Sequence, residues 1–297
     1  MCAVVLLALA ACDSTDQNPV EDRAAAQPVG CLCERVRPTL TGSWKAEDAQ
    51  PTLQPLSDSC WLTDSTDSNN RFRISVSVLP VTAKDAAEIR KTEELFMREA
   101  LYAVKPVDGG IGPDSWAVNP AAVGPWLVFR SGERMVRVAQ NTSGKGQLDA
   151  IRAVGRTINT LPGGIPAAPA VVQRPECALG TAAAEKLLGA KARSRRDTVV
   201  DGFAQCLWGS TTWTAFSRAG GIGSDPAVDF TIVRDAGTES EIGVRPVTVG
   251  AEGWQQPEGF TSYRVGKDTF VSIGAAPEMR PAATLALAQA MLPAYGG

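Results

Sequence analysis

The chain of 297 residues contains no histidine. That absence removes the commonest general base, the Ser-His and Cys-His nucleophile pairs, and the usual zinc ligand. Beyond its N-terminus the sequence also lacks any apolar run of the roughly 20 residues that a membrane-spanning helix needs. Its net charge of −3 provides no basic field, so we expect no nucleic-acid partner.

The composition that remains is that of a folded protein. Hydrophobic residues make up 44% of the chain and charged residues 21%, and the length allows two domains of ordinary size. The two Gly-Gly-Ile-Gly segments, at 109–112 and 220–223, have neither the glycine spacing nor the Lys-Ser/Thr of a phosphate loop. We therefore expect no cofactor, no metal site and no catalytic residue.

The first residues form an uncharged apolar segment that ends at Cys12 and is followed by polar residues. Its length is that of a secretory signal rather than of a membrane span. The segment Leu9-Ala10-Ala11-Cys12 resembles the bacterial lipobox. That resemblance implies cleavage before Cys12 and acylation of its sulfur, and two or three acyl chains give stable anchoring. We therefore expect a signal peptide over residues 1–11 and a lipid anchor at Cys12, on the extracytoplasmic face of the cell membrane.

Two further expectations concern this region. Export signals normally begin with a positive charge, which Met1-Cys2-Ala3 lacks, so either the true start lies upstream or the signal is weak. The alternative to an export signal is that the apolar segment forms a buried N-terminal strand or helix. Residues 13–28 are polar, acidic and without periodicity, which predicts a solvated tether that extends from Cys12 to the first domain.

The cysteines reveal an internal repeat. Cys31 and Cys60 are 29 residues apart, as are Cys177 and Cys206, and a tryptophan stands at or just after the second cysteine of each pair. Hairpin signals at 129–138 and 263–272 and helical segments ending in Leu-Pro, at 148–162 and 282–293, repeat as well. These matches predict a duplicated domain, with copies at 29–163 and 175–297 joined by a linker at 164–174.

In an exported protein the matched spacings predict two disulfides, Cys31–Cys60 and Cys177–Cys206. Buried free thiols are the alternative. Cys33 has no counterpart in the second copy and is best interpreted as a small buried hydrophobe. Three other interpretations stay open: a competing Cys33–Cys60 bond, an intermolecular bridge, and a redox-active Cys-x-Cys pair.

Each copy shows the elements of a sheet covered by helices. Alternation over residues 71–78 places Phe72, Ile74, Val76 and Val78 on one buried strand face. A helix is predicted at 84–102, capped by Thr82 and Asp85. Its apolar stripe is expected to consist of Ile89, Phe96 and Ala100, with Leu95 alongside. In the second copy we expect a helix from an N-cap at Thr181 to a stop at Gly189, and a weaker strand at 229–233, with little comparable to the long helix. The predicted class is α+β, an antiparallel sheet with packed helices used twice.

The lipobox, the Cys-x28-Cys spacing and the neighbouring tryptophan together resemble domains of unknown function in actinobacterial envelope lipoproteins. Some of those domains adopt a PsbP-like α/β/α sandwich. The resemblance covers both copies and implies location and fold, because the family mostly lacks an assigned activity. It also implies binding at the cell surface for some members.

Two groups of side chains are candidates for binding. A basic cluster at 191–196 is expected to be a solvated loop, with anionic lipid or cell-wall polymer as the alternative partner. Six tryptophans are candidates to line a glycan or lipid groove, although those beside the cysteines are expected in the core: Trp61, Trp116, Trp126, Trp208, Trp213 and Trp254.

The function predicted from these observations is a non-catalytic, lipid-anchored binding or scaffolding protein. Its expected partners are membrane lipid, through the acyl anchor, and a cell-wall, lipid or protein ligand. The alternative is an envelope hydrolase that works through Asp/Glu or a Ser/Lys pair, which needs no histidine.

Overall fold

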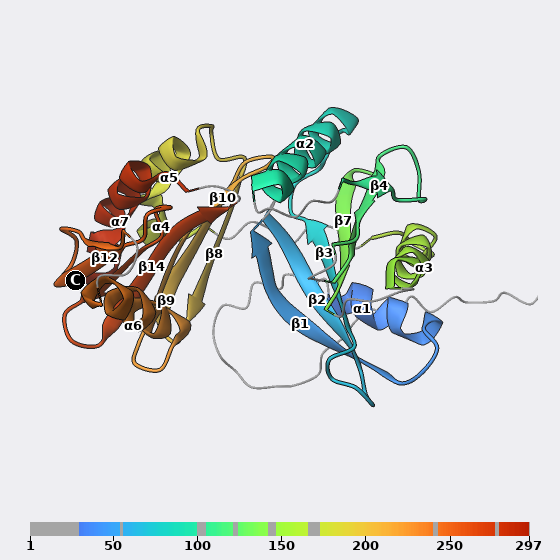
Figure 1. Cartoon of the computed structure of the whole chain (residues 1–297), viewed down its shortest axis with the longest axis horizontal. Coiled ribbons are helices and arrows are strands. Elements are labelled where there is room, and N and C mark those ends of the chain that lie inside the picture. Colours follow the sequence, from blue (N-terminus) through green and yellow to red (C-terminus); the bar gives the residue numbers. More distant parts are fainter. Residues whose placement is uncertain are drawn as a thin grey trace, which may run out of the picture.

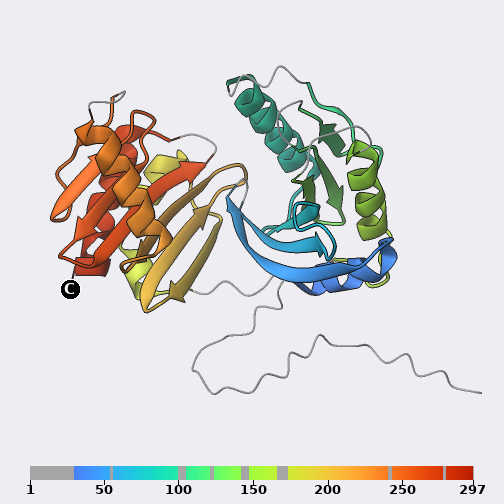
Figure 2. The ribbon, with the colours of Figure 1, turned by 60° about the horizontal axis from the view of Figure 1, so that its bottom comes forward.

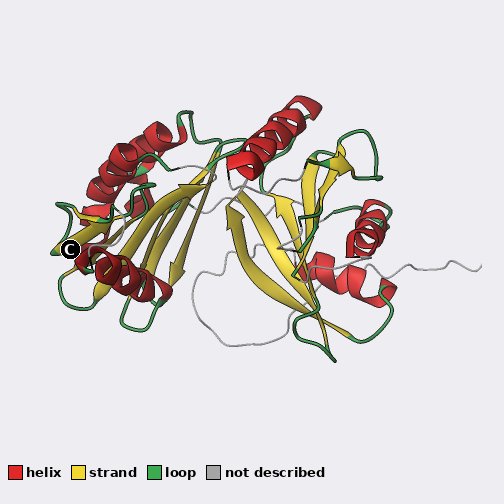
Figure 3. Cartoon of the chain, in the orientation of Figure 1, coloured by secondary structure: helices red, strands yellow, loops and turns green. Residues whose placement is uncertain are grey.

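The computed structural model describes residues 30–53, 56–99, 105–120, 124–141, 147–165, 173–239, 243–276 and 279–296. It contains two antiparallel seven-stranded sheets with helices packed against them, which makes the fold mixed α+β (Figures 1 and 3). Cys12, the predicted signal segment and the predicted tether lie outside the described residues. None of the helices described has both the length and the apolar character that crossing a bilayer requires.

The first half of the described chain, residues 30–165, builds one sheet in the order β1-β2-β3-β7-β6-β5-β4. Its elements are α1 (Gly30–Val36), a 3-10 turn (Arg37–Thr39), β1 (Trp44–Leu53), β2 (Leu56–Asp64), β3 (Arg71–Ser77), α2 (Ala83–Glu99), β4 (Val107–Asp108), β5 (Ser115–Val118), β6 (Trp126–Ser131), β7 (Arg134–Gln140) and α3 (Gln147–Asn159).

The second half, residues 173–296, builds the other sheet in the order β11-β12-β13-β14-β10-β9-β8. Its elements are α4 (Pro175–Ala178), α5 (Thr181–Leu188), β8 (Ser194–Val200), β9 (Phe203–Gly209), β10 (Thr214–Gly220), α6 (Asp225–Thr238), β11 (Arg245–Pro246), β12 (Glu252–Gln255), β13 (Thr261–Val265), β14 (Thr269–Ala276) and α7 (Pro281–Gly296). When the strands are counted from the start of each half, both sheets have the same strand order, with the fourth strand at the far edge.

The first sheet has an apolar cluster on each face, and β5 and the first part of β6 are buried on both sides. Phe72, Ile74 and Val76 alternate along β3 and pack in one cluster with residues of α1 and α3, as the sequence predicts. Val78, which was predicted on the same face, follows the end of β3 and is buried in a different cluster. A second cluster contains Trp116, Val118 and Val128 together with residues of α2. Ala117 and Leu127, their neighbours in sequence, belong to the first cluster, so the two clusters lie on opposite faces of one sheet.

Helix α2 begins as predicted. The amide of Asp85 donates to Thr82 Oγ1 at 3.1 Å, and the amide of Thr82 donates to the Asp85 carboxylate at 3.0 Å. This reciprocal pair is a capping box in which Asp replaces the usual Glu. In the predicted apolar stripe Ile89 is buried as expected, whereas Leu95 is exposed and Met97, which was not predicted, is buried instead. The side chains of Phe96 and Ala100 lie outside the described part of the helix.

The second half contains a helix where the sequence predicts a strand. Residues 229–233 lie inside α6, and the third strand of this half is β10. Helix α6 follows β10 as α2 follows β3, so the prediction that the second copy has no comparable helix is wrong. The missed signal is Ser224-Asp225-Pro226. Ser224 is an extended N-cap residue and Pro226 lies in the first turn, where its missing N–H has no cost. Figure 2 shows α6 crossing its sheet.

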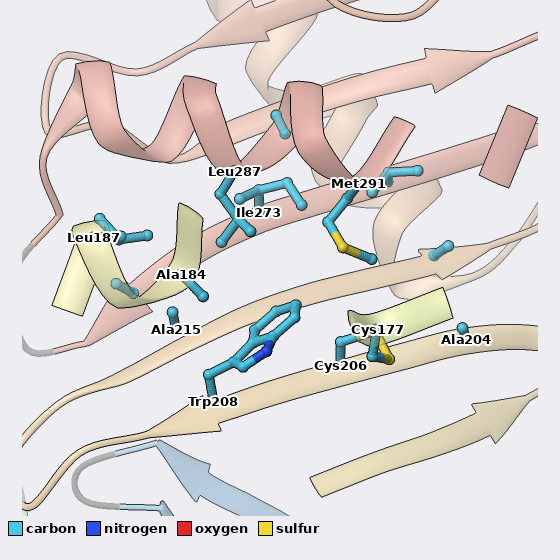
Figure 4. Packing of buried hydrophobic residues seen from close by; sticks show 14 of the residues in the cluster. Cys177, Ala184, Leu187, Ala204, Cys206, Trp208, Ala215, Ile273, Leu287 and Met291 are labelled. Atoms are coloured by element: carbon cyan, nitrogen blue, oxygen red, sulfur yellow. A yellow bond between two sulfur atoms is a disulfide. The ribbon is translucent and has the colours of Figure 1, made fainter. Parts of the chain in front are cut away.

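Helix α5 ends as predicted, with Gly189 in the left-handed conformation at φ 68°. It begins one residue earlier than predicted, because Gly180 is the N-cap and Thr181 is the first helical residue. The Thr181 hydroxyl instead accepts a hydrogen bond from the Trp208 indole at 3.1 Å. Figure 4 shows Trp208 in the centre of this core, which also contains residues of α7.

The last turn of α7 is bonded to the sheet. The Tyr295 hydroxyl lies 2.8 Å from Ser217 Oγ and donates to the Ala204 carbonyl at 3.2 Å. Burial raises the pKa of Tyr295 to about 12, so the phenol is neutral at physiological pH. These bonds attach the end of the helix to β9 and β10.

Candidate functional site

The first disulfide joins Cys33 to Cys60, with 6.2 Å between the Cα atoms, so the predicted Cys31–Cys60 pairing is wrong. Residues two apart on an α-helix project about 200° apart, so α1 presents only one of its two cysteine positions to β2. Cys33 is buried beside Leu32 and Val36 in the core cluster. It is therefore buried, as expected, but as half of a disulfide rather than as a free thiol.

The second disulfide joins Cys177 to Cys206 as predicted, with 5.5 Å between the Cα atoms. The buried carboxylate of Asp197 lies within 4.8 Å of both sulfur atoms. Because the two sulfurs are bonded to each other, they offer no thiolates to a metal ion. Arg195 forms an ion pair with Asp197, so this carboxylate has a structural partner.

Two of the candidate tryptophans fix α2 to the sheet. The Trp116 indole donates to one carboxylate oxygen of Glu93, and the Trp126 indole donates to the other at 2.7 Å. Arg137 pairs with the same carboxylate at 2.9 Å, and its guanidinium lies 5.0 Å from the Trp126 ring centroid. Glu93 therefore binds three donors, which makes it a structural carboxylate rather than a candidate for catalysis.

The other candidate tryptophans have different roles. Trp208 is buried in the core, and Trp254 donates to Glu252 at 3.0 Å. Trp213 is half-buried, with the Arg280 guanidinium 5.9 Å from its ring. Trp61 lies on the opposite strand face from Cys60, so its ring does not pack on the disulfide as expected. The guanidinium of Arg71 lies over this ring instead, 4.2 Å from its centroid.

The hollow with the best-defined chemistry lies at one end of the first sheet and has a volume of about 450 Å³. Its aromatic part is Trp44 of β1 and Phe72 of β3, whose ring centroids are 5.2 Å apart with a 36° tilt. Its polar lining consists of Asp67, Asn70, Gln140 and Gln147, and Ala150 of α3 completes it. None of the six candidate tryptophans lines this hollow. Trp44, which does, stands beside no cysteine and went unpredicted.

Hydrogen bonds hold the polar lining in place. Gln140 Nε2 donates to Asn70 Oδ1, and Asn70 Nδ2 donates to Asp64, each at 3.1 Å. Bonds from the backbone and hydroxyl of Thr66 lower the pKa of Asp64, which keeps this carboxylate ionised. Gln140 Oε1 is buried and accepts no hydrogen bond from the described residues. The hollow therefore combines an aromatic surface with a fixed amide group whose acceptor oxygen is unused.

The two halves meet in a small apolar cluster. Leu56 and Val78 of the first half pack with Leu207, Phe216 and Phe260 of the second. Gly209 lies against this contact, because a Cβ there would come within 3.1 Å of Leu56 Cβ. Figures 1 and 2 both show the region around β2 beside the second sheet. The cavity at this joint is about 10 Å³, which is room for one water rather than a ligand groove.

Ion pairs surround the apolar cluster of the joint. Asp58 of β2 pairs with Arg196 of β8, and both side chains are largely buried. Asp85 at the start of α2 pairs with Arg193 at 3.4 Å, and Arg193 also donates to Thr211 at 2.6 Å. The basic cluster at 191–196 is therefore mostly taken up by structural ion pairs, and part of it is strand rather than loop.

The comparisons identify no relative. No family model, no curated protein and no solved structure matches the chain.

Proposed function

We propose that this chain is a lipid-anchored protein of the extracytoplasmic cell envelope with a non-catalytic binding and scaffolding role. The hollow at Trp44 and Phe72 carries the binding part of this proposal. Aromatic rings pack against the C–H face of a sugar ring, while amides and carboxylates bond its hydroxyls. We assign the hollow to a sugar residue of a cell-wall polymer.

The hydrogen bonds of the hollow support this assignment. The amides of Asn70, Gln140 and Gln147 and the carboxylate of Asp67 line the hollow beside its aromatic part, and these groups are suited to bonding sugar hydroxyls. Asn70 and Gln140 hold each other in place, so binding would require little side-chain ordering.

Two structural features support the scaffolding part. The packed joint with its ion pairs holds the halves against each other, and a disulfide lies in each half. The first sheet has one apolar cluster with α1 and α3 on one face and another with α2 on the opposite face. Helices on both faces of a sheet support the α/β/α layering that the lipoprotein resemblance implies. Location rests on the lipobox resemblance at Cys12 alone.

The test uses the full chain produced in a lipoprotein-processing bacterium. The wild type is expected in the membrane fraction and Cys12→Ser in the soluble fraction, and an intact mass without acylation at Cys12 contradicts the anchor. In detergent, the wild type is expected to sediment with insoluble peptidoglycan. Trp44→Ala and Gln147→Ala should weaken that binding, by about tenfold for the loss of the indole. Trp213→Ala, a half-buried tryptophan outside the hollow, is the control, and equal binding by all variants contradicts the assignment.

A further inference from the structure

One end of the second half exposes apolar side chains. The β8–β9 turn and the segment before α6 are adjacent there, because a Cβ at Gly221 would lie 3.9 Å from the Phe203 ring. Exposed apolar groups gathered in this way mark an interaction surface. We call this surface the apolar end and define it by five exposed residues: Val199 at 44%, Val200 at 50%, Ile222 at 78%, Val228 at 52% and Ile232 at 59%.

Helix α6 contributes to this surface because it is apolar on two faces. Phe230 and Val233 are buried, and the Phe230 ring centroid lies 5.4 Å from that of Phe270 on β14. Val228 and Ile232, one turn apart, are exposed instead. A helix that is apolar on all sides is normally covered on all sides. The exposed face of α6 is therefore suited to contact with another apolar phase.

The apolar end is hollowed beside α6. Ile222, Val228 and Ile232 line a depression of about 320 Å³ together with Phe270. Thr231 is the one residue with a polar side chain in this lining. Specific ligand sites usually fix their ligand with several placed polar groups. The hollow therefore suits hydrocarbon rather than a ligand recognised by hydrogen bonds.

The charged side chains around the apolar end do not form a basic surface. Asp201 lies in the β8–β9 turn, and Lys267 and Asp268 lie in the β13–β14 turn, all three exposed. Asp225 at the start of α6 interacts electrostatically with the partly buried Arg218. Attraction to anionic lipid depends on clusters of Lys and Arg. A contact between this end and lipid would therefore depend on its apolar side chains.

The length of the chain before α1 keeps this end close to a bilayer. Residues 13–29 separate Cys12 from Gly30, where the described chain begins. A link of this length spans at most about 60 Å, and a folded chain of this size is about 50 Å across. Any surface of the anchored molecule can therefore reach the lipid, and the apolar end has the chemistry to enter it.

We propose that the apolar end inserts into the surface of the bilayer to which Cys12 is anchored. Ile222 precedes α6 and is the most exposed of its side chains, so it enters deepest, with Val228 and Ile232 beside it. The anchor keeps the local lipid concentration high, so a contact that is weak in solution is populated in the anchored molecule. The inference rests on the anchor proposed above and adds a second contact that orients the molecule on the membrane.

The test is hydrogen exchange of the full acylated chain anchored in phosphatidylcholine vesicles. The reference is the same protein after release by a protease, whose site is inserted within residues 13–28, and removal of the vesicles. Residues 199–202 and 221–232 are expected to exchange more slowly in the anchored protein. Ile222→Asp and Ile232→Asp should each lose this protection. When the released protein is titrated with vesicles, each substitution should weaken binding by about tenfold, because an isoleucine no longer enters hydrocarbon.

Leu179→Asp, an exposed hydrophobic position of the second half outside the apolar end, is the matched control and should behave as the wild type. Circular dichroism checks that each variant is folded. An acylated wild type without protection overturns the inference, as does protection that survives both substitutions or that requires phosphatidylglycerol in the vesicles.

Two further outcomes separate the occupant and the anchor. A dimer of the released protein in sedimentation velocity that Ile222→Asp abolishes overturns the inference, because a second copy then covers the apolar end. An unacylated Cys12 contradicts the proposed anchor, whereas an acylated chain without protection contradicts this inference alone and leaves the anchoring and binding proposals intact.

Discussion

At the residue scale, the carboxylate of Glu93 on α2 binds side chains from three different strands, Trp116 of β5, Trp126 of β6 and Arg137 of β7. It lies on the face of α2 that buries Ala86, Ile89 and Met97, where an unpaired carboxylate would be costly. Two indole donors and Arg137 satisfy it. A single charge therefore orients both Trp116 and Trp126 beneath the helix.

We expect Glu93→Gln to lower the free energy of unfolding by about 2 kcal/mol, because hydrogen bonds to a charged group weaken and Arg137 loses its partner. Glu94→Gln is the control. Glu94 pairs with Arg90 on the exposed side of the same helix, and its loss should cost less than about 1 kcal/mol. Urea unfolding followed by tryptophan fluorescence measures both. Equal midpoints for the two variants contradict the structural role of Glu93.

Individual residues were predictable where a local rule fixes them. The buried face of β3 follows from alternation, and the second disulfide follows from spacing. The choice between Cys31 and Cys33 depends on which side of α1 faces β2, and a seven-residue helix gives too short a pattern to decide it. Trp44 was missed because its partners Phe72 and Gln140 come from distant strands that only the sheet order brings together.

At the scale of elements, α2 is defined by its N-terminal cap. The Thr82 amide is the main cause of the lowered pKa of Asp85, with the Thr82 hydroxyl and Arg193 acting in the same direction against the effect of burial. The same carboxylate thus caps the helix and reaches the joint. Helix α6 was misread as a strand because its β-branched and apolar residues suit either element, and only tertiary packing on the sheet decides.

We predict that Asp85→Asn costs about 1 kcal/mol of stability near pH 6, the usual value of a cap. Because folding lowers the pKa of Asp85, its contribution is present above the ordinary value near 4 and is lost as the pH falls through the folded-state value. The stability difference between wild type and Asp85→Asn should therefore close between about pH 5 and pH 2. Urea midpoints across this range measure it, and a difference that stays constant in acid would falsify the role of the charge.

At the scale of the whole molecule, the joint is asymmetric, because the end of one half rests on the sheet face of the other. The repeated cysteines and hairpin signals predict a repeated fold, and the two sheets have the same strand order. The joint was not predictable, since Leu56, Leu207 and Phe216 form no sequence pattern and the alternation assigns Val78 to the core of its own half. These residues meet only when both sheets exist. Their contact leaves a cavity of only about 10 Å³ between the halves.

Gly209 gives a direct test of the joint. A Cβ at this position would approach Ser194 Oγ to 2.4 Å as well as Leu56, so Gly209→Ala should weaken docking by about 1–3 kcal/mol. Faster hydrogen exchange is expected at the start of β2. Gly221→Ala is the control, because the nearest atoms are 3.9 Å from its Cβ position. Identical exchange in both variants would show that the halves do not depend on this contact.

The bonds of Tyr295 have a practical consequence for handling the protein. The final turn of α7 is part of the core, since Tyr295 reaches Ser217 and the Ala204 carbonyl across the sheet. An affinity tag or fluorescent fusion placed directly after this turn would disturb the hydrogen bonds of Tyr295 to β9 and β10, the strands of the second half that form the joint. A flexible spacer before any such fusion would leave that contact undisturbed.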